Sequence, residues 1–396
     1  MRLERLLEEK RIVVCCGSGG VGKTTIAAAL AVRAAGMGRR TLVLTIDPAR
    51  RLANALGVSV FGNEVRRVPA RKFEATGVPL RGELHAMMLD TKRTFDDIVE
   101  RFAPSVEIRD AILGNAIYQQ LSDTLAGSRE YMAMEKLYEL YAEGGYDLIV
   151  LDTPPTKHAL DFLDAPDRII DFLGGGVVHL MLKPYLLAGR LGFKVFRRGA
   201  SSVFSILEKV TGMEFLRDLS DFILSFEGLY DGFRQRARRV KSLLAQEEAG
   251  FVLVACPERL ALEEAIFFYE QLVAHKMHVE AVVVNKVHLP AGPRPAGRRA
   301  QGAAETGLSP ERIERLASRM AGALGDPAFR TTAEKLLRNL AHHEVLAGMD
   351  ARNIEALRGP VGERIDFLEV PLLPVDVHDF EGLRLMNEHL FQGRAA

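Results

Sequence analysis

Residues 16–25 of the chain read CGSGGVGKTT, a glycine-rich run that closes on a lysine and two threonines. The apolar run before it, Ile12 to Cys15, has the length and β-branched composition of a buried strand. The residues after it, Ile26 to Val32, favour a helix. Strand, loop and helix therefore follow one another in the order that a Gly-x-x-x-x-Gly-Lys-Thr phosphate-binding loop requires. An ordinary glycine-rich turn is the alternative, and this context disfavours it.

The glycines of this loop would allow its backbone to bind a phosphate group. Without Cβ atoms the backbone can fold into a nest whose N–H groups face one anion, and the start of the following helix adds partial positive charge. Lys23 is predicted to reach the β- and γ-phosphates of a nucleoside triphosphate, and the Thr24 hydroxyl to hold Mg²⁺. The predicted nucleotide-binding residues of the loop are Gly19, Gly20, Val21, Gly22, Lys23, Thr24 and Thr25.

Composition narrows the class of protein. The 396 residues include 52 lysines and arginines against 52 aspartates and glutamates, so no overall field attracts nucleic acid or anionic lipid. Three cysteines, none in a CxxC pair, point to a reducing compartment. The first ten residues are charged and helix-like, and they lack the apolar core of a signal peptide. We expect a soluble, cytoplasmic protein that does not bind nucleic acid.

Polar residues end three later strand-like runs, and in an α/β sheet such positions meet at the ligand-binding edge. Asp47 follows the run Thr41 to Ile46; it could orient a water for attack on the γ-phosphate, or it could simply form a turn before Pro48. Asp152 follows another run and has the pattern of a carboxylate that binds magnesium through water. Asn285, after Val279 to Val284, could read adenine with its amide.

The order of elements predicts the organisation of the chain. Strand and helix patterns alternate up to Asp152 and resume at Phe251, whereas residues 156–248 contain apolar helical stripes and no clear strand. We predict one α/β domain over residues 1–396, a doubly wound, mostly parallel sheet of the P-loop NTPase type, with a helical insertion subdomain at 160–245. The insertion either closes on its own core or presents a groove. Its basic cluster is expected to be a solvated helix face: Arg234, Arg236, Arg238, Arg239 and Lys241.

Several of these stretches together carry a resemblance to a known family. They are Gly17 to Thr25, Thr45 to Ala49, Asp152 to His158, Cys256 to Glu258, Asn285, and Pro371 to Pro374. In this order they resemble the family of arsenical pump-driving ATPases and tail-anchored-protein-targeting ATPases. The resemblance runs from the first strand to the end of the chain and is loose at 60–120 and 165–245.

The resemblance implies roles for individual residues. By this match Asp47 is the aspartate that positions the attacking water, and Asp152 is the acid of the segment that senses the γ-phosphate. Asn285 matches an adenine-contacting asparagine, and Pro374, Val375 and Asp376 match a loop that closes over the base. The cofactors implied are ATP and Mg²⁺. Family members act as dimers that close on ATP, and the helical subdomain couples closure to a client or a membrane partner.

The chain departs from the family pattern in three ways. Ser18 stands where the family's phosphate loop usually has a lysine that reaches the partner's nucleotide. The zinc-binding CxxC and the metalloid-binding cysteines are missing, and Cys15, Cys16 and Cys256 are expected to be buried, inert thiols. The sequence carries one nucleotide domain, whereas many pump ATPases carry two.

The function expected from the sequence is that of an Mg²⁺-dependent ATPase, a nucleotide-driven conformational switch coupled to a hydrophobic protein client or a membrane protein. It is expected to work as a homodimer or as a heterodimer with a family member. Two alternatives stay open. One is a true arsenical pump-driving ATPase, and the other is a client-binding chaperone with slow, regulatory ATP turnover.

Overall fold

The computed structural model describes residues 2–46, 51–58, 63–76, 79–124, 128–154, 213–291, 310–324, 329–362 and 365–391. Its centre is an eight-stranded sheet in the order β3-β4-β2-β5-β1-β6-β7-β8. The strands are β1 (Ile12–Cys16), β2 (Arg40–Thr45), β3 (Arg66–Arg67), β4 (Glu83–Met88), β5 (Leu148–Asp152), β6 (Ala249–Ala255), β7 (Val279–Val287) and β8 (Asp366–Pro371).

All neighbouring strands of the sheet run parallel except β3, which pairs antiparallel with β4 at one edge. The central strand β1 pairs with β5 on one side and with β6 on the other. From β1 the chain first adds strands on one side of the sheet and later, from β6 on, adds them on the other side. Ligands bind at such a reversal, beyond the carboxyl ends of the strands. The mostly parallel, doubly wound sheet predicted from the sequence is therefore confirmed.

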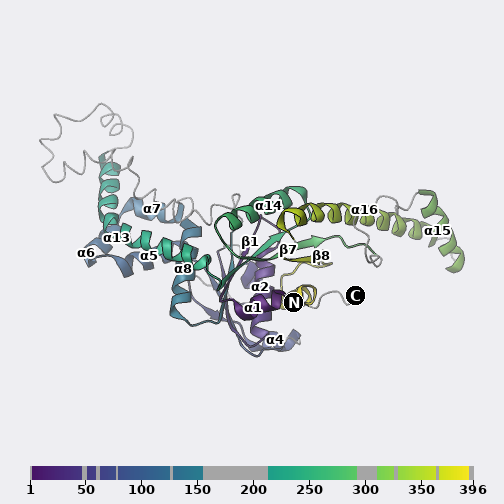
Figure 1. Ribbon diagram of the computed structural model, residues 1–396, viewed down its shortest axis with the longest axis horizontal. Coiled ribbons are helices and arrows are strands. Elements are labelled where there is room, and N and C mark those ends of the chain that lie inside the picture. The colour runs from purple at the N-terminus through teal and green to yellow at the C-terminus, as the bar shows by residue number, and fades with distance from the viewer. Residues whose placement is uncertain are drawn as a thin grey trace.

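Helices cover both faces of the sheet and make it a three-layer structure (Figure 1). Successive residues of β1 show why its sequence is apolar throughout: Val14 packs into one core and Val13 into the other. The first core lies mainly under α5 (Thr91–Phe102), α6 (Val106–Leu113), α7 (Ala116–Thr124), α8 (Ser128–Glu143), α13 (Met213–Leu244), α14 (Arg259–Ala274) and the end of α16 (Phe329–Val361). The second lies mainly under α1 (Arg2–Glu9), α2 (Lys23–Gly36), α3 (Arg51–Leu56), α4 (Ala70–Thr76) and α17 (Phe380–Phe391).

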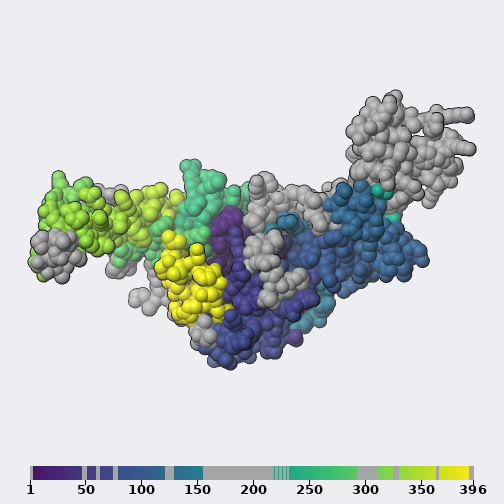
Figure 2. Space-filling view, turned by 180° about the vertical axis from the view of Figure 1, so that it is seen from behind, coloured from purple at the N-terminus to yellow at the C-terminus, as the bar shows by residue number. Residues whose placement is uncertain are grey.

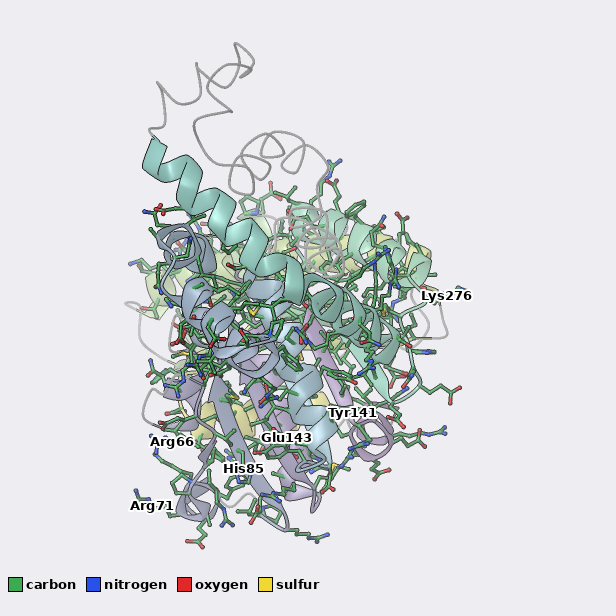
Figure 3. All side chains as sticks on the ribbon, turned by 90° about the vertical axis from the view of Figure 1, so that its left-hand side faces the viewer. Arg66, Arg71, His85, Tyr141, Glu143 and Lys276 are labelled. Atoms are coloured by element: carbon green, nitrogen blue, oxygen red, sulfur yellow. The ribbon has the colours of Figure 1, made fainter. Side chains whose placement is uncertain are left out.

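One end of the molecule is helical, and α13 lies there beside α5 to α8 (Figure 3, which views the molecule from this end). α13 is the described part of the predicted insertion, and residues 155–212 lie outside the description. The expected solvated basic face is wrong at one position. Arg234, Arg238 and Arg239 are exposed, but Arg236 is buried: its Nε lies 3.2 Å from the Glu135 carboxylate on α8. The paired carboxylate and the Phe102 ring, 3.8 Å from the guanidinium carbon, make this burial tolerable.

An arm projects from the opposite end of the molecule (Figures 1 and 2). It consists of α15 (Pro310–Leu324) and the outer part of α16, which pack against each other. The inner part of α16 packs against α14 and β7. At its base the Asp350 carboxylate accepts hydrogen bonds from the backbone N–H of His288, over 2.8 Å, and lies 2.8 Å from the Nδ1 of the same residue. His288 directly follows β7, so the arm is fastened to the end of that strand.

None of the helices in the described ranges combines the length and the apolar content that crossing a bilayer requires. The organisation of residues 1–396 as a single domain stays a prediction.

Candidate nucleotide-binding site

The glycine loop joins β1 to α2, as the sequence predicts, and two of its glycines have no substitute. Gly17 has φ +143°, and a Cβ there would lie 2.0 Å from the Val254 carbonyl oxygen on β6. Gly22 has φ +100°, and its Cβ would lie 2.3 Å from the Asn285 side-chain nitrogen. Both positions combine a left-handed backbone with a close approach from a neighbouring strand, which only glycine allows.

Lys23 is the first residue of α2 and points back across the loop. Its Nζ donates a hydrogen bond to the Ser18 carbonyl oxygen over 2.8 Å, and its side chain is 6% exposed. The charge therefore lies at the positive end of a helix, where it can only be stabilised by carbonyl oxygens or by an anion. A phosphate group provides the second kind of partner, which is the role predicted for Lys23.

A pair of oxygen groups lies beside the start of α2. The Thr24 hydroxyl donates to Oδ2 of Asp152 over 2.7 Å, and the Thr45 hydroxyl donates to the same oxygen over 2.8 Å. Asp152 is fully buried at the end of β5, where it pairs in register with Thr45 of β2. A hydroxyl and a carboxylate are hard oxygen donors of the kind that Mg²⁺ takes together with phosphate oxygens and water. The predicted metal residues, Thr24 and Asp152, therefore fit the ion by chemistry and by proximity.

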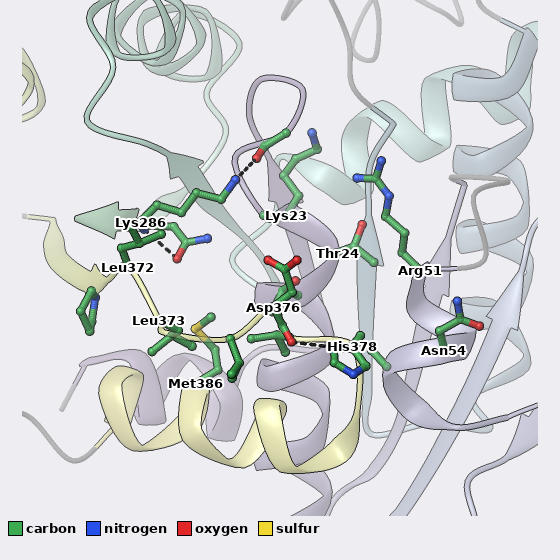
Figure 4. Close-up of a pocket in the computed structure, with 18 of the residues that line it drawn as sticks. Lys23, Thr24, Arg51, Asn54, Lys286, Leu372, Leu373, Asp376, His378 and Met386 are labelled. Carbon is green, nitrogen blue, oxygen red and sulfur yellow. Dashed lines mark hydrogen bonds between the residues drawn. The ribbon is translucent and has the colours of Figure 1, made fainter. Parts of the chain in front are cut away.

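The end of β7 approaches the loop from the other side (Figure 4). The Asn285 side-chain nitrogen donates to the Val21 carbonyl oxygen over 2.9 Å, and its Oδ1 accepts from the Lys286 N–H over 2.9 Å. An amide keeps a second N–H and a second lone pair after these two bonds, so contact with a base remains compatible with them. Lys286 donates from Nζ to the Gly20 carbonyl oxygen over 2.8 Å.

A cavity of about 620 Å³ opens between these elements (Figure 4), within the size range of small-molecule cofactor sites. The phosphate loop and the start of α2 form one wall, and Asn285 and Lys286 form a second. The segment after β8 forms a third, with apolar side chains of Leu372, Leu373 and Met386. An anion-binding nest thus lies next to an apolar compartment suited to a flat ring.

The structure brings together most of the residues predicted from the sequence. Those that line the cavity are Gly19, Gly20, Gly22, Lys23, Thr24, Thr25, Asn285, Val375 and Asp376. Val21 is buried behind the loop, Asp152 is buried beside Thr24, and Pro374 immediately precedes Val375 without lining the cavity. Asp47 lies outside the described residues, as do Thr156 to His158. The nucleotide-binding roles of all these residues stay predictions.

Sequence reasoning missed several residues that line the same cavity. Arg51 and Asn54 come from α3, and His378 from the segment before α17; in Figure 4 all three lie on the side away from β7. The available signal for Lys286 was its place directly after Asn285 at a strand end. For Arg51 and Asn54 the signal was their place just after Asp47, on the same edge of the sheet.

The three cysteines of the chain are all buried thiols, as expected. Burial raises the pKa of Cys15 well above its ordinary value, and the nearby Asp152 carboxylate raises it further. Burial raises the pKa of Cys16 to about 12, and burial also raises the pKa of Cys256. The thiolate is the form that reacts and binds soft ions, so none of these residues is set up for that chemistry.

A parallel sheet with a glycine loop between β1 and α2, and an aspartate at the end of β5, defines a P-loop NTPase. The chain belongs to the anion-transporting ATPase family, whose model matches residues 10–301. The family resemblance read from the sequence is thereby confirmed, and with it ATP binding at the level of the family.

Individual relatives are distant. The chain is 26% identical over 283 residues to the putative arsenical pump-driving ATPase 1 of Aquifex aeolicus, covering 70% of this chain and 63% of that protein. It is 26% identical over 291 residues to ATPase GET3 of Ajellomyces dermatitidis, covering 73% of this chain and 76% of the relative. A similar match, 26% over 293 residues, relates it to ATPase GET3 of Malassezia globosa. The chain thus matches less than two thirds of the length of the first of these relatives.

Proposed function

We propose that the chain is an Mg²⁺-dependent ATP hydrolase that works as a nucleotide-driven conformational switch, coupled to a protein client or a membrane partner. The observation that carries the proposal is the bond between Thr24, which lines the cavity, and Asp152, which is buried beside it. This bond joins the start of α2 to β5, the strand whose next residues lead toward 160–245. A group that comes between these two side chains acts on both elements at once.

Each residue of the site then has a step in the reaction. The loop N–H groups and Lys23 bind and orient the phosphates, and they offset the charge that spreads over the transferred phosphoryl group. Thr24 and Asp152 would hold Mg²⁺, which would neutralise part of the charge of the phosphates. Asp47 is proposed to orient the attacking water, as its family match implies. Asn285 and the segment Pro374 to Asp376 are proposed to hold the adenine ring.

Dimerisation and the cytoplasmic location belong to the same proposal. The family suggests a dimer that closes on ATP, although Ser18 stands where the family usually has the lysine that reaches the partner's nucleotide. A measurement of mass in solution with ATP, ADP and no nucleotide tests this part. A monomer in all three states would separate the switch from dimer closure.

The arsenical-pump alternative has a specific observation against it. Metalloid binding to cysteines requires accessible thiolates, and the three thiols here are buried with raised pKa values. Arsenite or antimonite should leave the rate of ATP hydrolysis unchanged. A several-fold stimulation would restore this alternative. The client-binding chaperone differs from the proposal chiefly in its turnover rate, so a slow, client-stimulated hydrolysis would favour it.

The switch itself is tested by hydrogen exchange with ATP, ADP and no nucleotide, using Asp47→Asn to preserve the ATP state. We expect the protection of residues 181–187 and 215–226 to change with ATP, because the segment that senses the γ-phosphate leads directly into the insertion. Identical protection in all three states would make the insertion a passive core. A change confined to residues 17–25 and 285 would leave a simple nucleotide-binding enzyme.

A further inference from the structure

Lys286 has an unusual backbone for its residue type. Its φ is +61°, in the left-handed region, and among the described residues Lys276 is the other non-glycine residue with positive φ. Such a conformation is uncommon for a residue with a Cβ and costs free energy that the surroundings must offset. Lys286 also lies where the register between β7 and β8 shifts, between Val284 and Val287.

The left-handed residue changes where the side chains point. Successive side chains of a regular strand point to opposite faces, so Asn285 and Lys286 would ordinarily diverge. Here both reach the phosphate loop and bond to consecutive carbonyl groups. Asn285 bonds to Val21, and Lys286 bonds to Gly20 (Figure 4). The irregular end of β7 thus fastens the loop at two adjacent peptides.

The direction of a carbonyl decides the direction of its neighbouring N–H, because the two groups of one planar trans peptide point oppositely. With the Gly20 carbonyl turned toward Lys286, the N–H of Val21 turns away from β7. With the Val21 carbonyl turned toward Asn285, the N–H of Gly22 does the same. These are consecutive donors of the glycine loop, and a nest of such donors is what binds a phosphate.

We infer that Lys286 is a positioning residue for the bound nucleotide: its ammonium group holds the Gly20 carbonyl so that the Val21 N–H is aimed at a phosphate. The inference rests on the proposed function, because it requires ATP in this cavity. It deepens that function by assigning a second lysine to the loop. Lys23 acts on the phosphate itself, whereas Lys286 acts through the backbone.

A purely structural role for this hydrogen bond fits the structure less well. Lys286 is exposed, and an exposed bond contributes little to stability. The left-handed backbone is itself unfavourable, so the residue as a whole gives little or no net stabilisation to the apo protein. Residues that keep a strained backbone without stabilising the apo protein are typical of ligand-binding sites.

The test measures release of a fluorescent ATP analogue by stopped flow in the presence of Mg²⁺. Lys286→Met retains the aliphatic stem and loses the ammonium group, and Lys286→Arg retains a cation. Lys276→Met is the matched control: it is another left-handed lysine, but it lies in the turn before β7, at the far end of that strand, and projects at the rim of the molecule (Figure 3).

We expect Lys286→Met to release the analogue about tenfold faster, the effect of losing the charge-assisted hydrogen bond from the Val21 N–H, no longer aimed, to a phosphate. Lys286→Arg should stay within about threefold of wild type, and Lys276→Met should be indistinguishable from it. The thermal midpoint of each apo protein should stay within about 2 °C of wild type.

One outcome would overturn the inference alone: unaltered release by the folded Lys286→Met protein, whether or not its apo midpoint falls. Failure of the wild-type protein to bind the analogue would contradict the proposed function, and the inference with it.

Discussion

The Thr24 hydroxyl donates to the Asp152 carboxylate over 2.7 Å and so links the first turn of α2 to the end of β5. The two residues are 128 positions apart in the chain, and the bond lies beside the loop that holds Lys23. If this pair holds Mg²⁺, Thr24→Val should raise the Mg²⁺ concentration needed for half-maximal ATP binding by about tenfold. Titration of Mg²⁺ at fixed ATP measures it.

Thr45→Val is the control for Thr24→Val, because Thr45 also donates to Asp152 but does not line the cavity. Its Mg²⁺ requirement should stay close to wild type. Equal shifts in the two variants would mean that the hydroxyls only support Asp152.

Lys23→Ala removes the lysine at the start of α2, whose Nζ reaches back across the loop to the Ser18 carbonyl oxygen. We expect ATP affinity to fall by about a hundredfold or more, since the phosphates lose their charge-assisted contact. Isothermal titration with ATP and Mg²⁺ measures the loss. Undiminished hydrolysis by this variant would mean that the active site lies elsewhere.

Asp47→Asn should separate binding from chemistry, although Asp47 itself lies outside the described residues. Orientation of the attacking water matters in the transition state, so turnover should fall by about 10² or more while ATP affinity stays within a few fold. Steady-state hydrolysis and equilibrium binding are compared on one preparation. Parallel losses of both would assign Asp47 to the turn before Pro48.

Gly22→Ala should abolish nucleotide binding and lower the thermal midpoint, because the new Cβ would meet the Asn285 amide at 2.3 Å in a left-handed backbone. Gly144→Ala is its matched control: Gly144 has φ +69°, with no atom within 4 Å of the added Cβ. It should cost about 1 kcal/mol of stability and leave binding intact. If the two variants have the same thermal midpoint and the same nucleotide affinity, the close approach of Asn285 to Gly22 does not restrict the residue at position 22.

Arg236→Met should destabilise the protein by about 3 kcal/mol at pH 7, because it leaves Glu135 buried without its cation. Arg234→Met, two residues earlier and exposed, should change stability by less than about 0.5 kcal/mol. Urea unfolding at both positions makes the comparison. Equal effects at 234 and 236 would show that burial of the ion pair carries no stability.

The same variant has a defined pH dependence. Burial already raises the pKa of Glu135, and Arg236 opposes that rise. Without Arg236 the folded-state pKa rises further above the unfolded value near 4.5, so the folded protein holds a proton that the unfolded chain releases. The stability lost by Arg236→Met is therefore smallest below about pH 4.5 and grows as pH rises through the folded-state pKa. An equal loss at pH 5 and pH 8 would contradict this linkage.

Local sequence signals were sufficient for the centre of the fold. The glycine loop requires particular residues at fixed spacing, and the strands on both sides of β1 are apolar runs because both faces of a parallel sheet are buried. Long-range placement was harder. Arg236 lies in the same basic run as the exposed Arg234, and what separates their environments is the approach of Glu135 on α8 and of Phe102 on α5 to Arg236.

Lys286 and the arm show two further limits of sequence reasoning. The period of a regular strand places Lys286 opposite Asn285, and nothing local announces the left-handed residue that brings them together. α16 is exposed along much of its outer part, so the one-sided apolar stripe that marks a packed helix is weak there. The long helix Phe329–Val361 therefore has no clear signature beyond its general helix-forming composition.

The attachment of the arm at Asp350 has a geometric consequence. From Asp350 outward to Phe329, α16 extends by about 30 Å at the ordinary rise of a helix. The His288 that Asp350 holds lies two positions from Lys286, at the edge of the cavity. A tilt of α16 by one degree about Asp350 would therefore displace its outer end, near Phe329, by about half an ångström.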